Sequence, residues 1–180
     1  MTKKVNKIVI FDFDGTLVST PLPDIGKELY EQKHGTPWPH TGWWGKSESL
    51  DMNTFDIPTI ESVIEAYQKH VQEPDTLVVM LTGRMVKLAS HVKVILDTHN
   101  LVFDEYHYNT GGSTEVAKVK AMESLLDKYP DVIEIEMFDD RLEHIPIFEV
   151  WGDSLVKSGR ITKFHINVVE SNHHDPINND

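Results

Sequence analysis

The sequence predicts a doubly wound α/β fold, a parallel sheet covered by helices on both faces, with a small cap insertion after the first strand. Short apolar runs of strand length recur along the 180 residues, and helix-like segments separate them. Strands that alternate with helices are joined by right-handed crossovers, which make the sheet parallel. One long stretch after the first run interrupts the alternation. A chain of this length is sufficient for a single core, so one domain with an insertion is expected.

Five apolar runs are expected to form the strands. The first, VNKIVIFD, ends in acidic residues and a glycine, and its continuous apolar character is typical of a strand buried on both faces. Similar runs follow further along the chain. The predicted strands are Val5–Asp12, Thr76–Thr82, Leu101–Tyr106, Val132–Phe138 and Ile161–Val168.

Three helices are expected between these strands. The first covers Met85–Thr98. The second covers Glu115–Tyr129, with Thr114 as its N-cap. In the third, Ile145–Lys157, Pro146 falls in the first turn, where its missing N–H has no helical partner to lose.

An insertion is predicted at about residues 19–70, because loops between a strand and a helix usually have only ~2–6 residues. It contains the aromatic sequence WPHTGWWG at 38–45 and a helix, Thr59–His70, that is expected to return the chain to the core. Residues 1–168 are thus expected to form one domain that includes the insertion. The polar residues 169–180 are expected to be a disordered tail.

Charge and composition exclude several classes of protein. Seventeen Lys and Arg against 29 Asp and Glu give a net charge of −12, which argues against a broad basic surface for a nucleic-acid backbone. The absence of cysteine excludes disulfides, thiolate nucleophiles and Cys-ligated metals. No apolar run approaches the ~20 residues that cross a bilayer. We therefore expect a cytoplasmic protein with no membrane association and no obligate protein partner.

The chemistry is expected to centre on FDFDGTLV, residues 11–18, which closes the first strand. Side chains two positions apart in an extended chain project to the same side, so Asp12 and Asp14 converge at the sheet edge where α/β proteins bind ligands. Two adjacent carboxylates repel each other unless a cation or a proton lies between them. The pair therefore predicts a hard divalent cation such as Mg²⁺.

Two further polar clusters follow the second and fourth predicted strands. LTGR contains Thr82, Gly83 and Arg84. Gly83 allows close approach to the backbone, and Arg84 is a candidate to bind either a phosphate or a neighbouring acid through its planar fork. FDDR contains Asp139 and Asp140, which offer hard oxygen ligands. For this acidic pair the alternative is a stabilising role at a helix N-terminus.

In this order, the strings FDFDGTLV, LTGR and FDDR resemble motifs I, II and IV of the haloacid dehalogenase (HAD) superfamily. The resemblance implies a phosphatase in which Asp12 is the nucleophile that forms an aspartyl-phosphate. It implies that Asp14 is the general acid and base. It also implies that the hydroxyl of Thr82 and the adjacent backbone at Gly83 hold a phosphoryl oxygen.

The same resemblance implies a lysine and a metal site. The motif III lysine neutralises the phosphate and the nucleophile, and TEVAKVK, residues 114–120, offers Lys118 and Lys120. Lys118 is preferred because it lies one turn into the helix, on the same face as the cap. Asp139 is the first choice for a direct ligand, and Asp140 for support. The ligands implied for Mg²⁺ are Asp12, Asp14 through its backbone carbonyl, Asp139 and Asp140.

A finer resemblance rests on DDRLEHIPIF together with LTGR and GWWG. This combination resembles the HAD domain of Swiss-army-knife RNA-repair proteins and the phosphatase half of polynucleotide kinase-phosphatases. It implies a phosphorylated substrate, namely the 3′ or 5′ phosphate of a nucleic-acid end. Trp43 and Trp44 are then candidates to stack on a base beside the phosphate. The alternative for both tryptophans is a small core beneath the insertion.

Two other functions remain open from the sequence. A phosphatase of small metabolites or nucleotides is consistent with a closed cap and few basic residues. A non-catalytic HAD-like interaction domain belongs to a different class, and such domains tend to lose the nucleophile or the general acid. Both Asp12 and Asp14 are present in this chain.

Overall fold

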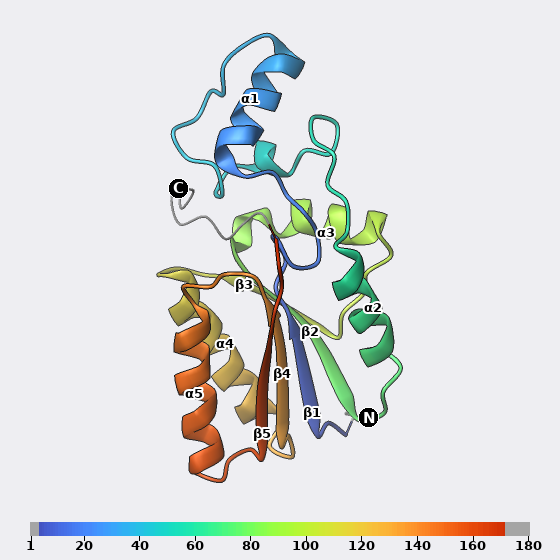
Figure 1. Ribbon diagram of the computed structural model, residues 1–180, viewed down its shortest axis with the longest axis vertical. Helices are drawn as coiled ribbons and strands as arrows, with labels where there is room; N and C mark the ends of the chain where they lie inside the picture. Colours follow the sequence, from blue (N-terminus) through green and yellow to red (C-terminus); the bar gives the residue numbers. More distant parts are fainter. Residues whose placement is uncertain (1–3, 172–180) are drawn as a thin grey trace.

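The computed structural model describes residues 4–171 as a five-stranded parallel sheet between two layers of helices (Figure 1). The strand order is β3-β2-β1-β4-β5, and every neighbouring pair is parallel. The predicted fold class is confirmed. The strands are β1 (Lys7–Phe11), β2 (Thr76–Met85), β3 (Glu105–Asn109), β4 (Glu134–Asp139) and β5 (Lys163–Val168).

The sheet is buried on both faces, and its central strand carries apolar side chains on both. Val9 and Phe11 of β1 face one core, whereas Ile8 and Ile10 face the other. The first core is covered by α2 (Glu61–His70) and α3 (Ala89–Thr98), and the second by α4 (Thr114–Lys128) and α5 (Ile145–Lys157). The continuous apolar run predicted this arrangement.

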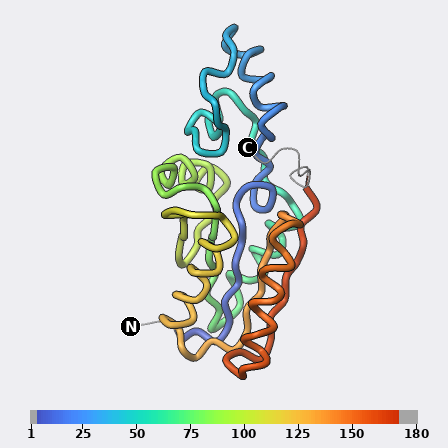
Figure 2. The backbone as a smooth tube through the Cα atoms, turned by 90° about the vertical axis from the view of Figure 1, so that its left-hand side faces the viewer, coloured from blue at the N-terminus to red at the C-terminus, as the bar shows by residue number. Residues whose placement is uncertain are grey.

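Residues 19–58, which we call the lobe, project beyond the carboxyl ends of the strands (Figures 1 and 2). The lobe contains α1 (Pro23–His34) and a 3₁₀ turn, Ser47–Leu50. Its two ends lie side by side, because the N–H of Ser19 donates to the carbonyl of Pro58 at 2.8 Å and that of Ile60 to Leu17 at 3.0 Å. After the lobe, α2 returns the chain to the sheet, as expected from the sequence.

A buried tryptophan holds the lobe together. Trp43 is 1% exposed, and its indole N–H donates to the carbonyl of Pro21 at 3.1 Å. The ring packs on α1 where Gly26 lacks a side chain: a Cβ there would lie 2.1 Å from Cη2 of Trp43. The ring also contacts Trp38 and Phe55, with centroids 4.7 and 5.6 Å away. Gly26 is therefore required by close packing.

Three predicted boundaries were wrong, and one is the start of the first predicted helix at Met85: β2 extends to Met85, and α3 begins at Ala89. The apolar residues 101–103 do not form the third strand; Leu101 and Phe103 are buried in a loop, and β3 follows at Glu105–Asn109. The N-cap of α4 is Ser113, and Thr114 is its first helical residue. Helix α1 was not predicted. The prediction of a disordered tail from residue 169 is wrong at Val169, which is buried and donates its N–H to the carbonyl of Asp139 at 2.9 Å; residues 172–180 lie outside the described part. Among the described helices, none has the length and apolarity to span a membrane.

Candidate active site

Three strands end at the same edge of the sheet and bring the predicted acidic residues together. β1 pairs with β2 on one side and with β4 on the other, so Phe11 lies beside both Met80 and Phe138. Asp12 follows β1, and Asp139 ends β4. The connection from β1 goes first to β2, away from β4, so this edge is a topological switch point, where open α/β sheets bind ligands.

Lys118 joins the two central carboxylates. Its ammonium group donates to Oδ1 of Asp12 at 2.9 Å and to Oδ2 of Asp139 at 2.7 Å. The side chain is 2% exposed and comes from the second turn of α4. Lys120, the alternative, is exposed. The structure therefore brings Lys118, and not Lys120, to the acidic residues.

Asp12, Asp139 and Asp140 form a buried acidic cluster. One oxygen from each of the three carboxylates lies within 4.8 Å of the others. The hydroxyl of Thr16 donates to Asp12 at 3.2 Å and lies 3.5 Å from Asp140, and the hydroxyl of Ser171 donates to Asp140 at 2.9 Å. The backbone N–H of Arg141 donates to Asp139 at 3.0 Å. Three carboxylates with one ammonium leave an excess of negative charge at this edge.

This crowding shifts the acid–base properties of the cluster. Burial, followed by the neighbouring Asp139 carboxylate, raises the pKa of Asp12 well above its usual range. The same two causes raise the pKa of Asp140 to about 6. Burial alone would lower the pKa of Lys118, but the Asp12 and Asp139 carboxylates raise it above its usual value. The lysine is therefore charged, but its single positive charge does not neutralise the three neighbouring carboxylates.

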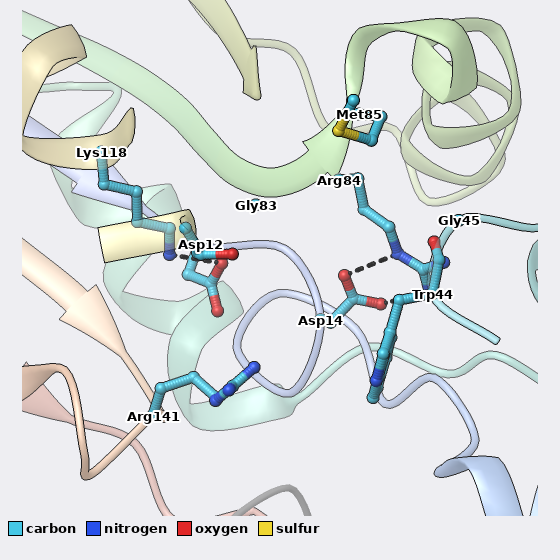
Figure 3. A pocket seen from close by; sticks show the side chains of 10 residues that line it. Asp12, Asp14, Trp44, Gly45, Gly83, Arg84, Met85, Lys118 and Arg141 are labelled. Carbon is cyan, nitrogen blue, oxygen red and sulfur yellow. Dashed lines mark hydrogen bonds and ion pairs between the residues drawn. The ribbon is translucent and has the colours of Figure 1, made fainter. Parts of the chain in front are cut away.

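A cavity of about 300 Å³ opens between the sheet edge and the lobe (Figure 3). The lobe contributes Trp44 and Gly45, and the body contributes the remaining walls. Figure 3 shows Asp12 with Lys118 on one side of the cavity and Asp14 with Arg84 and Trp44 on the other. The lining residues are Asp12, Asp14, Trp44, Gly45, Gly83, Arg84, Met85, Thr114, Lys118 and Arg141.

Residues 28–176 match the model of HAD domain family 1 in Swiss Army Knife RNA repair proteins. This match extends over most of the chain and includes LTGR, Lys118 and FDDR. The chain belongs to this family. It is a HAD-family phosphatase-like domain, as the resemblance implied.

A curated relative of this HAD domain is the uncharacterized protein YMR265C of Saccharomyces cerevisiae, 25% identical over 175 residues. The alignment covers 84% of this chain but only 38% of the yeast protein. The domain therefore corresponds to less than half of that relative.

Solved structures share the fold of this HAD domain. The Pnkp1/Rnl/Hen1 complex contains a chain that superposes with a TM-score of 0.57 at 14% identity, covering 94% of this domain and 48% of that chain. The HAD domain of the effector protein Lem4 from Legionella pneumophila gives 0.53 at 14% identity, covering 96% and 90%. A predicted phosphatase from Clostridium acetobutylicum gives 0.50 at 16% identity, covering 91% and 94%.

In this HAD domain, the predicted convergence of the Asp12 and Asp14 side chains is corrected, because Asp14 points away from the acidic cluster and toward Arg84. Its carboxylate accepts hydrogen bonds from the forked guanidinium of Arg84 and from the hydroxyl of Thr20. Of the two partners considered for Arg84, the neighbouring acid is the one it contacts. Thr82 is 2% exposed, and its hydroxyl oxygen accepts the N–H of Arg84 at 3.1 Å. Gly83 lines the cavity next to Thr114, whose methyl carbon would lie 2.5 Å from an added Cβ.

The two adjacent tryptophans have different environments. Trp44 lines the cavity, with the guanidinium carbon of Arg84 5.0 Å from its ring centroid. The prediction that Trp43 offers a stacking surface is corrected, because a ring with 1% exposure, packed on Gly26, has no face available to a substrate. For Trp43 the core alternative is the one the structure shows.

Sequence reasoning did not assign four of the residues around this site. Arg141 lines the cavity, and its guanidinium donates to Glu143 at 2.7 Å. Its position in FDDR directly after the acidic pair was the available signal. Thr16, Thr20 and Ser171 bind the carboxylates through hydroxyls. Hydroxyl residues are common on surfaces, and only the fold shows that these three face Asp12, Asp14 and Asp140.

Proposed function

We propose that this HAD domain is a Mg²⁺-dependent phosphatase that acts on phosphate monoesters, with Asp12 as the nucleophile. The observation that carries the proposal is the ammonium group of Lys118 between Asp12 and Asp139, beside a cavity lined by Asp14. A fixed cation next to a carboxylate nucleophile attracts the anionic phosphoryl group and offsets its charge during transfer.

The proposed reaction proceeds through two successive displacements at phosphorus. An Asp12 oxygen attacks phosphorus, the bond from phosphorus to the ester oxygen breaks, and Asp14, protonated at the start of this step, gives its proton to the departing oxygen and becomes a carboxylate. Water then attacks phosphorus in the aspartyl-phosphate, Asp14 accepts the water proton, and inorganic phosphate leaves as the Asp12 carboxylate is restored. Thr82, Gly83 and Lys118 are the proposed contacts for the phosphoryl oxygens.

The acidic cluster fits Mg²⁺ by its donor set. Its carboxylate oxygens are hard ligands, and their excess negative charge matches a divalent cation. The proposed ligands are Asp12, Asp139 and Asp140, with the backbone carbonyl of Asp14. When bound, Mg²⁺ would hold a phosphate oxygen and neutralise part of its charge.

The proposed substrate is the phosphorylated 3′ or 5′ end of a nucleic acid. The family takes its name from RNA repair proteins, and Trp44 provides an aromatic ring at the cavity. A small-metabolite or nucleotide phosphatase is the second candidate, supported by a cavity at the lower end of the ~300–1,000 Å³ that small ligands occupy.

A phosphate-release screen tests both candidates. It compares 3′- and 5′-phosphorylated oligonucleotides, nucleotides and sugar phosphates in Mg²⁺, and after EDTA. We expect the highest kcat/KM on an oligonucleotide end and no turnover by Asp12→Asn, which keeps the shape of the side chain but not its nucleophile. A preference for nucleotides or sugar phosphates would favour the second candidate. Turnover by folded Asp12→Asn, or full activity after chelation, would contradict the mechanism.

A further inference from the structure

Arg84 is a buried cation whose hydrogen bonds go to two different parts of the molecule. The residue is 3% exposed and lies at the end of β2. On one edge of the guanidinium, Nε and Nη2 donate to the two oxygens of Asp14 at 3.0 and 2.7 Å. From the other side, Nη1 donates to the backbone carbonyl of Trp44 at 2.6 Å and to the hydroxyl of Ser49 at 2.8 Å.

The geometry constrains Asp14 strongly. A planar guanidinium that binds both oxygens of a carboxylate fixes its position and its rotation, which a single hydrogen bond does not do. The hydroxyl of Thr20 adds a third donor at 2.7 Å. Asp14 is thereby directed along one side of the cavity (Figure 3).

The other contacts of Arg84 anchor the lobe. Ser49 is fully buried in the 3₁₀ turn, and Trp44 precedes that turn and lines the cavity. The indole ring of Trp44 lies close to the guanidinium, at 5.0 Å. One rigid group therefore contacts both Asp14 and the lobe wall that faces it.

We propose that Arg84 is a positioning residue that orients Asp14 for proton transfer and couples this orientation to the lobe through Trp44 and Ser49. This inference rests on the proposed function, in which Asp14 protonates the leaving group. The forked edge of the guanidinium is occupied by Asp14, so Arg84 acts on the reaction through Asp14 and not by binding the phosphate.

The test compares a leaving group that needs a proton with one that leaves readily as an anion. The ratio of kcat on p-nitrophenyl phosphate to kcat on an alkyl phosphate, the leaving-group ratio, therefore reports on Asp14. We expect Arg84→Gln to lower kcat on the alkyl phosphate by roughly 100-fold, the effect of misplacing a catalytic group by about 1 Å. The loss on p-nitrophenyl phosphate should be much smaller, so the ratio should rise, as we also expect for Asp14→Asn.

Two further variants keep the test decisive if Arg84→Gln folds poorly. Arg84→Lys retains the charge but not the fork, and we expect an intermediate ratio. Ser49→Ala removes one lobe contact and leaves the fork on Asp14, and we expect a smaller rise in the ratio. An unchanged ratio in Ser49→Ala would overturn the coupling to the lobe.

A double variant separates positioning from phosphate binding. If Arg84 acts through Asp14, Arg84→Gln combined with Asp14→Asn should be no slower than Asp14→Asn alone. Additive losses, or a higher KM on both substrates with an unchanged ratio, would show that Arg84 binds phosphate and would overturn the proposal.

Arg160→Gln is the matched control for removing an internal arginine. Arg160 donates to the backbone carbonyls of Val132 and Leu126 at 2.7 and 2.8 Å, near the amino ends of the strands. We expect a lower melting temperature and an unchanged leaving-group ratio. The same result in Arg84→Gln would reduce its role to stability.

Failure of the proposed function would give a different result. The wild-type domain would release no phosphate from either substrate, or Asp12→Asn would remain active, and both proposals would then be wrong.

Discussion

Lys118 holds the acidic cluster together through its ammonium group. Without its ammonium group, Asp12 and Asp139 would face each other in a buried site. We expect Lys118→Ala to abolish turnover and to lower the free energy of unfolding by about 3–5 kcal/mol, as when one partner of a buried ion pair is removed. Lys120→Ala, an exposed change on the same helix, should stay within about 0.5 kcal/mol.

Thermal melts and phosphate release on both lysine variants check this prediction. Lys118→Gln serves where the alanine variant does not fold. A larger loss of activity in Lys120→Ala than in Lys118→Ala would move the proposed role by two residues along α4.

Asp139 and Asp140 are adjacent but have different hydrogen-bond partners, so we expect substitutions at the two positions to have different effects. Asp139 is bound by Lys118 and by the backbone N–H of Arg141, whereas Asp140 is bound by hydroxyls. We expect Asp140→Asn to raise the Mg²⁺ concentration needed for half-maximal activity. Asp139→Asn should also lower the melting temperature, because it weakens the ion pair of Lys118.

Mg²⁺ titrations of phosphate release, with a melt of each variant, measure both effects. The sequence favoured Asp139 as the direct Mg²⁺ ligand. Because one oxygen of Asp139 already binds Lys118, we now expect Asp140 to contribute more to Mg²⁺ binding. A larger Mg²⁺ requirement in Asp139→Asn, with an unchanged melting temperature, would restore the original assignment.

Trp43 and Trp44 are adjacent in the chain but belong to different parts of the lobe: Trp43 lies in its core, and Trp44 lines the cavity. If Trp44 stacks on a base, Trp44→Ala should lose about 1–3 kcal/mol of binding to a phosphorylated oligonucleotide and keep most turnover of p-nitrophenyl phosphate. Trp43→Ala removes a buried ring and should instead lower stability by about 3–5 kcal/mol. Oligonucleotide binding, both activities and melting temperature, measured on this pair, distinguish the two roles. Equal losses on both substrates in Trp44→Ala would remove the stacking role.

The sequence predicted the elements that carry the candidate site better than the elements around it. β1, β2 and β4 are buried in the sheet and end in the polar strings, so apolar pattern and motif coincide there. β3 lies at the edge and is half-buried along most of its length, whereas Leu101 and Phe103 fill the core from the preceding loop and Val102 between them is exposed. Helix α1 buries only Pro23 and Gly26, and so has no apolar stripe to identify it.

Long-range contacts account for what the sequence could not predict at the site. Arg84 and Asp14 are 70 positions apart, and Trp44 and Ser49 reach Arg84 from a lobe with no regular pattern. Local sequence gives the chemistry of each group but not which partner it finds. The fork of Arg84 on Asp14, and the burial of Trp43 next to an accessible Trp44, follow from the packing of the lobe on the sheet.

The overall negative charge of the protein restricts how a nucleic acid can bind. The net charge is −12, and two cations of the site, Arg84 and Lys118, are already paired with carboxylates. Such a surface repels a long polyanion, so binding should involve the terminal phosphate and few others. We expect the logarithm of the binding constant to fall with the logarithm of salt concentration with a slope of only about −0.7 to −1.4, as for one or two phosphates of a single strand.

Binding of phosphorylated oligonucleotides of increasing length, at several salt concentrations and with the Asp12→Asn domain, measures this slope. Affinity should stop rising after a few nucleotides. A slope that steepens continuously with length would show a backbone-binding track that the overall charge conceals.

The paired ends of the lobe have a consequence for protein engineering. Backbone hydrogen bonds join Ser19 to Pro58 and Leu17 to Ile60, so residues 19–58 leave and re-enter the body of the protein at adjacent points. Lobes of other lengths can therefore be transplanted between these anchor points without changing the distance that the recipient scaffold must bridge. A graft needs to supply a hydroxyl and a carbonyl for Arg84, a hydroxyl for Asp14 in place of Thr20, and an apolar underside for the scaffold. A library of exchanged lobes on one catalytic scaffold is then a practical route to altered selectivity.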